Sequence, residues 1–177
     1  MKAFLFDTET TGLIENHTLA LDKQPSVIEF FGCLADLKTG KIISSVDTLI
    51  KPPKPVSGEV TKITGLTNDD LANAPTFLEV QDKIFPALEG APIIIAHNLS
   101  FDKEMMELEA ERLSRKIKWP RLICTVEQTV ALKGFRLSLS ALHEHLFNET
   151  FTGAHRARVD VEALLRCCKK LHKMGAI

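Results

Sequence analysis

The chain contains no tyrosine, a single tryptophan and almost no net charge. Its 22 basic and 23 acidic residues leave a formal charge of -1, whereas a protein that coats nucleic acid regardless of sequence is strongly basic. Any contact with nucleic acid is therefore expected to be local and aided by metal ions. The composition, 45% hydrophobic and 25% charged, is typical of globular domains and excludes disordered, collagen-like and disulfide-dominated classes.

Long apolar runs and cysteine motifs are absent as well. The longest apolar run covers residues 91–96 and includes Pro92, so no segment is expected to span a bilayer. The N-terminus reaches Asp7 too soon for a signal peptide. The four cysteines have neither CxxC nor zinc spacing, which predicts reduced, mostly buried thiols in a cytoplasmic protein. A length of 177 residues suits one domain covering residues 1–177.

The hydrophobic pattern predicts three strands followed by alternating helices and strands. The expected strands are 2–7, 26–36, 41–51, 92–96 and 122–124, and the expected helices are 57–65, 76–90, 100–114, 125–132, 138–147 and 157–174. Ser57, Thr76 and Ser100 are the expected caps of the first three helices. A turn at residues 38–40 predicts a hairpin. The sequence therefore predicts an α/β fold with a mixed sheet covered on both faces.

Asp7 ends the first predicted strand, and Glu9 follows two residues later. Side chains two residues apart on a strand point the same way, so both carboxylates are expected at the edge where α/β sheets place ligands. Neighbouring carboxylates repel unless a cation lies between them. For this motif alone, a simple strand-end cap is an equally good interpretation.

Two further clusters contain acids at helix starts. Asp102 falls in the first turn of the helix that follows strand 92–96. Asp160 falls in the first turns of the last helix, and His155 is expected in the loop ahead of it, after Gly153. Each cluster alone has a competitive alternative, because the helix dipole favours an acid in the first turn and a histidine can be structural.

The combined set offers four carboxylates and one histidine. Oxygen ligands without cysteine favour Mg²⁺ or Mn²⁺ over zinc. Two such ions form the clamp that cleaves phosphodiester bonds, and a nearby histidine suits a general base.

Residues 6–13 (FDTETTGL), 97–102 (HNLSFD) and 155–160 (HRARVD) resemble, in order and separation, the three motifs of the DEDDh 3′–5′ exonucleases. This family includes relatives of the proofreading subunit of bacterial replicative DNA polymerase and of ribonuclease T. The sister DEDDy type would need a tyrosine four residues before Asp160. That position is Arg156, and the chain has no tyrosine.

The resemblance implies a ribonuclease H-like fold with a five-stranded mixed sheet, the first three strands antiparallel, and helices on both faces. It implies that Asp7 bridges two Mg²⁺ or Mn²⁺ ions and that Glu9 binds one ion and approaches the terminal 3′-hydroxyl. Asp102, through water, and Asp160 would complete the ion shells, and His155 would be the general base. The implied reaction releases nucleoside 5′-monophosphates from 3′ ends, with DNA favoured as the substrate.

The resemblance also implies a pocket for the terminal nucleotide. Its expected residues are Thr10, Thr11, Gly12, Leu13, Gly65, Leu66, Asn98 and Phe101. Thr64 stands where many relatives carry a histidine, and His97 is as readily structural as functional. The expected partner is a single-stranded or frayed 3′ end of nucleic acid.

Several alternatives stay open at this stage. They are an exoribonuclease of the ribonuclease T or oligoribonuclease kind, a non-catalytic nucleic-acid-binding module on the same fold, and a ribonuclease H-like endonuclease. Polymerase association is also open, and we expect either a stand-alone enzyme or a domain cut from a longer protein. A basic stretch, 112–121, contains Trp119; we favour a solvated helix end with Trp119 in the core over a nucleic-acid track.

Overall fold

A computed structural model describes all 177 residues and contains one five-stranded mixed sheet. The strands are β1 (Lys2–Thr10), β2 (Val27–Asp36), β3 (Lys41–Leu49), β4 (Ile93–Ala96) and β5 (Arg121–Cys124). Their order in the sheet is β3-β2-β1-β4-β5. The first three pair antiparallel, whereas β1–β4 and β4–β5 are parallel. The predicted hairpin and the predicted mixed sheet are both confirmed.

Helices follow the strands close to the expected positions. They are α1 (Gly58–Thr64), α2 (Asn68–Ala72), α3 (Phe77–Glu89), α4 (Leu99–Arg112), α5 (Thr125–Lys133), α6 (Leu139–Phe147) and α7 (Ala157–Lys173), with a 3-10 turn η1 (Leu21–Lys23). Ser57 and Thr76 cap α1 and α3 as predicted. The prediction that Ser100 caps α4 is wrong. Asn98 is the cap, in a left-handed conformation (φ 64°), because the chain turns into the helix only two residues after β4.

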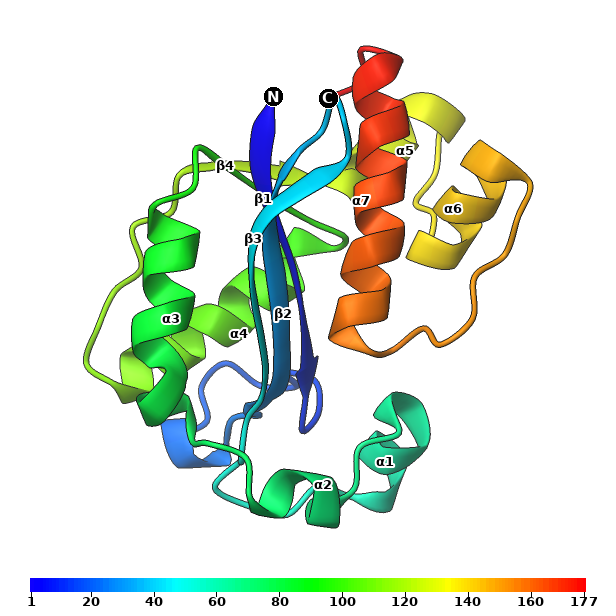
Figure 1. Cartoon of the computed structure of the whole chain (residues 1–177). Helices are drawn as coiled ribbons and strands as arrows, with labels where there is room; N and C mark the ends of the chain where they lie inside the picture. Colours follow the sequence, from blue (N-terminus) through cyan, green and yellow to red (C-terminus); the bar gives the residue numbers. More distant parts are fainter.

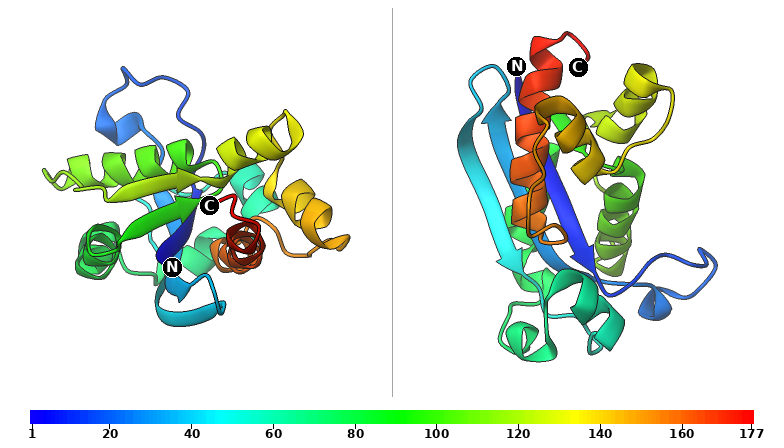
Figure 2. Two further views of the ribbon diagram at one scale, coloured as in Figure 1. Left: turned by 90° about the horizontal axis from the view of Figure 1, so that it is seen from above. Right: turned by 90° about the vertical axis from the view of Figure 1, so that its right-hand side faces the viewer.

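The helices cover both faces of the sheet (Figures 1 and 2), as predicted. Alternating side chains of β1 explain this arrangement, because successive residues point to opposite faces. Phe4 and Phe6 join the cluster that buries α3 and α4, whereas Ala3 and Leu5 join the cluster that buries α7. With apolar side chains on both faces, β1 is the buried centre of the sheet.

One end of the sheet gathers the three motifs. Figure 1 shows the end of β1, the start of α7 and the short helices α1 and α2 at the same end of the molecule. The first turn of α4 follows β4, the parallel neighbour of β1. The topology therefore brings residues far apart in the sequence to one edge.

The helices and the cysteines bear on two predictions made from what the sequence lacks. None of its helices is long and apolar enough to cross a membrane. All four cysteines are free thiols, and Cys33, Cys167 and Cys168 are buried.

Candidate active site

Asp7 and Glu9 lie near the C-terminal end of β1, and both line one cavity. The ladder to β2 slips between Glu9 and Thr10, which pair with Glu29 and Val27. Such a bulge twists the strand and ends regular pairing next to a functional edge. Beyond it, the Thr10 hydroxyl donates to the Gly12 carbonyl at 2.7 Å. The bulge and this turn let the carboxylates leave the sheet at its end.

Asp160 meets these two acids from the first turns of α7. One carboxylate oxygen each from Asp7, Glu9 and Asp160 lies within 4.8 Å of the others, a spacing that a metal ion can span. His155 lies in the loop ahead of α7, as the sequence predicts, with a left-handed backbone (φ 68°). Its backbone N–H donates to Oδ2 of Asp160 at 2.8 Å, which ties the loop to the helix.

Asp102 lies on the same cavity but outside that close group. It is almost fully buried, 2% exposed. Its Oδ1 accepts the backbone N–H of Thr8 at 3.0 Å and the Thr8 hydroxyl at 2.8 Å. Since both bonds reach one oxygen, the second oxygen remains for a ligand in the cavity. Thr8, between the two acids of β1, therefore links the first motif to the second.

Burial and mutual repulsion raise the pKa values of the four carboxyl groups. Burial raises the pKa of Asp7 well above its usual value, and the charges of Asp102 and Glu9 raise it further. Burial, followed by the charge of Asp160, raises the pKa of Glu9 to about 8. Burial also raises the pKa of Asp102 to about 7 despite the two bonds from Thr8, and it raises the pKa of Asp160. Acids whose pKa values rise together in one cleft favour a bound cation.

The cluster lies in a cavity of about 850 Å³, large enough for a nucleotide-sized ligand. Of the residues expected to contact substrate, five line this cavity: Thr10, Gly12, Leu13, Asn98 and Phe101. Leu13 is 73% exposed, unusual for an apolar side chain, and thus available to a ligand.

Three expected pocket residues lie outside the cavity wall. Leu66 is 3% exposed and packs with Ile28 and Leu71 in a small apolar cluster. Gly65 forms the left-handed end of α1. The Thr11 hydroxyl accepts the backbone N–H of Ser26, so it supports the start of β2. As substrate contacts these three residues stay predictions, and in the structure each also has a packing or backbone role.

Sequence reasoning placed Thr64 near the pocket, and the structure has Val60, Ile63 and Thr64 of α1 on the cavity wall. It missed the segment that leads from α5 into the first turn of α6, where Arg136, Leu137, Ser138, Leu139 and Ser140 line the cavity. A basic residue after a helix-ending glycine, Gly134, was the available signal for this segment.

His97 anchors that segment. Its Nδ1 lies 2.9 Å from the Thr125 hydroxyl, and its Nε2 lies 3.1 Å from the Leu137 carbonyl. A carbonyl can only accept, so these partners assign the proton to Nε2. Burial lowers the pKa of His97 to about 4, which keeps the ring neutral. Both ring nitrogens of His97 thus have partners within the protein, and the residue also lines the cavity.

Three residues of the basic stretch, Arg112, Arg115 and Trp119, make contacts within the protein. Trp119 stacks on Phe6 with ring centroids 6.4 Å apart, and its indole N–H donates to Glu107 at 3.0 Å. Arg112 donates to three backbone carbonyls of residues 21–25, and Arg115 pairs with Glu89 at 2.7 Å. The expected packing of Trp119 against the core is confirmed, and the absence of a nucleic-acid track stays a prediction.

The fold is an α/β fold of the ribonuclease H-like kind, and its acidic edge is a candidate metal site. The family model described as "Exonuclease" matches residues 4–167, so the chain belongs to this exonuclease family. The predicted DEDDh membership, ribonuclease H-like fold and 3′–5′ exonuclease class are confirmed at this level.

Two proteins similar to this chain in sequence are DNA polymerase III proteins. The chain is 30% identical to the DNA polymerase III subunit epsilon of Treponema pallidum over 172 residues, 94% of this chain and 72% of that protein. It is 28% identical to a PolC-type DNA polymerase III of Caldanaerobacter subterraneus, matching 97% of this chain but only 12% of the polymerase. The chain therefore spans a small part of that polymerase.

A solved structure shares the fold. The nuclease domain of 3′hExo, a DEDDh family member bound to rAMP, superposes with a TM-score of 0.80 at 17% identity, covering 99% of this chain and 93% of that one. The likeness extends over both helix layers and the whole sheet, since nearly every residue is covered.

Proposed function

We propose that residues 1–177 form one exonuclease domain that removes nucleotides from the 3′ ends of DNA with two divalent metal ions. The observation that carries this proposal is the group of three carboxylate oxygens within 4.8 Å at the mouth of a cavity. Membership of the exonuclease family supports the reaction class. The similarity to DNA polymerase III proteins supports DNA as the substrate.

The donor set fits hard divalent cations. One carboxylate oxygen each from Asp7, Glu9 and Asp160 converges there, and oxygen ligands are those that Mg²⁺ and Mn²⁺ prefer. Asp7, Glu9 and Asp160 would hold the ions directly, with Asp102 contributing through water. When bound, two such ions would lower the pKa of a water molecule and stabilise the charge on the leaving oxygen.

The remaining steps belong to the protein's own side chains. His155 lies on the cavity beside Asp160, where its imidazole can take the proton from the attacking water. Leu13 and Phe101 offer apolar contact to the terminal nucleotide, and Asn98 offers an amide. The product of attack at the terminal phosphodiester is a nucleoside 5′-monophosphate.

The cellular setting is part of the same proposal. The epsilon and PolC similarities support a domain that works with a replicative polymerase in the cytoplasm. Co-purification of the chain with a bacterial polymerase subunit would test the partner separately from the chemistry.

The decisive experiment follows end-labelled DNA and RNA strands of matched sequence, with Mg²⁺ or Mn²⁺ or with EDTA. We expect stepwise shortening of 5′-labelled DNA from its 3′ end, and mononucleotides only when metal is present. Shortening of RNA alone would favour an exoribonuclease, and cleavage of circular single strands an endonuclease. Absence of any cleavage by the folded protein would refute the proposal and leave a binding module.

His155→Ala and Asp160→Asn test the assigned roles. Each is expected to lower the turnover number by at least about a hundredfold. His155→Ala removes the proposed general base, whose catalysis contributes roughly 10²–10⁴-fold, and Asp160→Asn removes a proposed metal ligand. Lys38→Ala, on the hairpin turn at the far end of the sheet, is the matched control.

A further inference from the structure

Glu29 is a buried carboxylate beside the acidic cluster, and it belongs to none of the three motifs. It lies on β2 directly opposite Glu9 of β1, and its side chain is 4% exposed. Directly opposed residues of antiparallel strands point to the same face with Cβ atoms about 5 Å apart. Two like charges in this position destabilise the sheet unless one of them is compensated.

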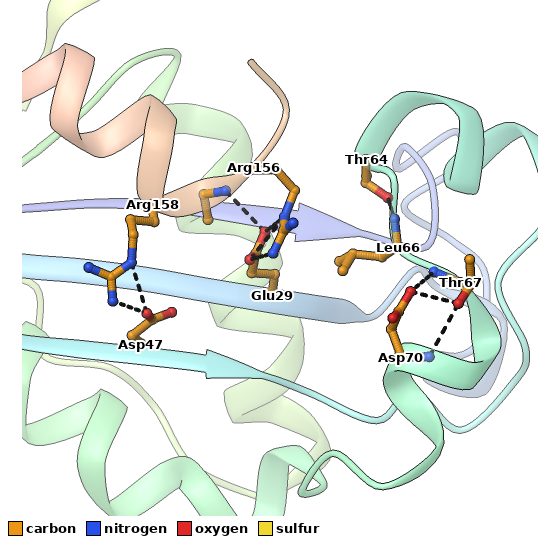
Figure 3. A network of polar contacts seen from close by, with 9 residues as sticks. Glu29, Asp47, Thr64, Leu66, Thr67, Asp70, Arg156 and Arg158 are labelled. Atoms are coloured by element: carbon orange, nitrogen blue, oxygen red, sulfur yellow. Dashed lines mark hydrogen bonds and ion pairs between the residues drawn. The ribbon is translucent and has the colours of Figure 1, made fainter. Parts of the chain in front are cut away.

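Arg156 supplies that compensation from the loop before α7. Its Nε lies 3.2 and 3.1 Å from the two carboxylate oxygens of Glu29, and its Nη2 lies 2.8 Å from Oε1. The backbone N–H of Ala157, the first residue of α7, donates to Oε2 at 3.1 Å. Figure 3 shows these bonds converging on Glu29 from the junction between the loop and the helix. We call the three residues the Glu29 clamp.

The clamp holds the residue next to His155. Arg156 is extended (φ -132°, ψ 118°), whereas His155 before it is left-handed (φ 68°). A left-handed backbone is unfavourable for a residue with a side chain, so it persists only where its surroundings fix it. The Glu29 clamp fixes the chain on one side of His155, and the bond from its own N–H to Asp160 fixes the other.

Asp160 depends on the clamp far less. It lies within α7, which buries Val161, Leu164 and Leu165 against the sheet. This packing sets the place of Asp160 whether or not Arg156 is bound. His155 lacks this packing against the sheet, because it is exposed and lies outside α7.

We propose that Glu29 is a positioning residue that acts through Arg156 and the Ala157 N–H to aim His155 at the acidic cluster. This inference rests on the proposed role of His155 as general base. It assigns Glu29 to the protein's own scaffold rather than to a metal ion, because both of its oxygens already accept hydrogen bonds.

The first two variants, Arg156→Lys and Glu29→Gln, weaken the Glu29 clamp and leave the acidic cluster and His155 in place. Arg156→Lys keeps the positive charge but loses the planar fork that contacts both oxygens. Glu29→Gln keeps the shape and one acceptor oxygen. Both are expected to lower kcat at least tenfold, with KM for a DNA strand and Mn²⁺ affinity unchanged within twofold. Arg158→Lys is the matched control, since Arg158 pairs with Asp47 along the sheet (Figure 3); it is expected to keep kcat within twofold.

A double-variant cycle then shows whether the clamp acts through His155. Arg156→Lys is introduced into the parent and into His155→Ala, and residual rates are measured at high enzyme concentration. We expect the tenfold loss in the parent to fall below twofold when His155 is absent, because the residue being aimed is gone.

Other outcomes overturn the proposal in distinguishable ways. Equal losses in both backgrounds would make the clamp merely structural, and a loss confined to KM would make Arg156 a substrate contact. A tenfold weaker Mn²⁺ affinity of Glu29→Gln, by calorimetry, would make Glu29 a metal ligand. If His155→Ala alone keeps the parent rate, the proposed general base fails, and the positioning role fails with it.

Discussion

Replacing Glu9 with glutamine measures the electrostatic penalty of the acidic edge. Burial raises the pKa of Glu9 from 4.5 to about 8, so the folded chain binds this proton more tightly than the unfolded chain. The free energy of unfolding therefore falls as the pH rises from about 4.5 to about 8, and the full penalty persists above that range. Below about pH 4.5 the carboxyl is protonated in both states and the penalty vanishes.

The size of the effect follows from the shift. At 1.36 kcal/mol per pKa unit, the shift corresponds to at most about 5 kcal/mol, and solvent relaxation reduces the measurable part to about 2 kcal/mol. An unfolding entropy of about 2.1 cal/mol/K per residue gives about 0.4 kcal/mol/K for the whole chain. Glu9→Gln is thus expected to raise the melting temperature of the metal-free protein by about 5 °C at pH 9.

Thermal melts in EDTA, followed by circular dichroism, test this expectation. The gain of Glu9→Gln should shrink by more than half between pH 9 and pH 5.5, and Mn²⁺ should stabilise the parent more than the variant. Glu111→Gln, on the exposed side of α4, is the matched control and should show no pH-dependent gain. A Glu9→Gln protein that is less stable than the parent at pH 9 in EDTA would refute the electrostatic reasoning.

Three further variants test the packing around the site. Gly32→Ala should destabilise the protein by about 1–3 kcal/mol in urea melts, because its Cβ would meet the Phe4 ring at 2.5 Å; an unchanged midpoint would contradict the close approach. His97→Ala should cost about 1–3 kcal/mol and raise KM for a DNA strand, because the cavity segment it anchors loses its support; an unchanged KM would separate that segment from substrate binding. Arg115→Ala should lower stability by less than about 1 kcal/mol and leave DNA affinity within twofold, because its guanidinium pairs with Glu89; a large loss of affinity would restore the nucleic-acid track.

The sequence predicts much of this architecture because local signals and long-range packing agree. A continuous apolar run at residues 3–6 predicts β1, and the caps at Ser57 and Thr76 predict two helix starts. The short helix α2 was missed because only five residues form it, held by a Thr67–Asp70 capping box too brief to leave a periodic pattern. The Asn98 cap was missed because an asparagine in a left-handed turn depends on how tightly β4 leads into α4.

In the candidate site, too, residues with a local sequence signal were predicted, and residues defined by long-range contacts were not. Its acids were predicted because their order and spacing carry the family resemblance, and the structure gathers three of their oxygens. Glu29 and Arg136 were not predicted, because their partners lie 127 and 38 residues away. In an isolated sequence, such residues look like any strand acid or loop arginine.

The late position of α7 in the chain has a consequence for when activity arises. The edge of β1 is made first, yet its third acid arrives on a helix that starts at Ala157. A nascent or truncated polypeptide without that helix has β1 and β4 but an unfinished cation site. Under the proposed function, cleavage of nucleic acid would therefore require α7 to be folded onto the sheet.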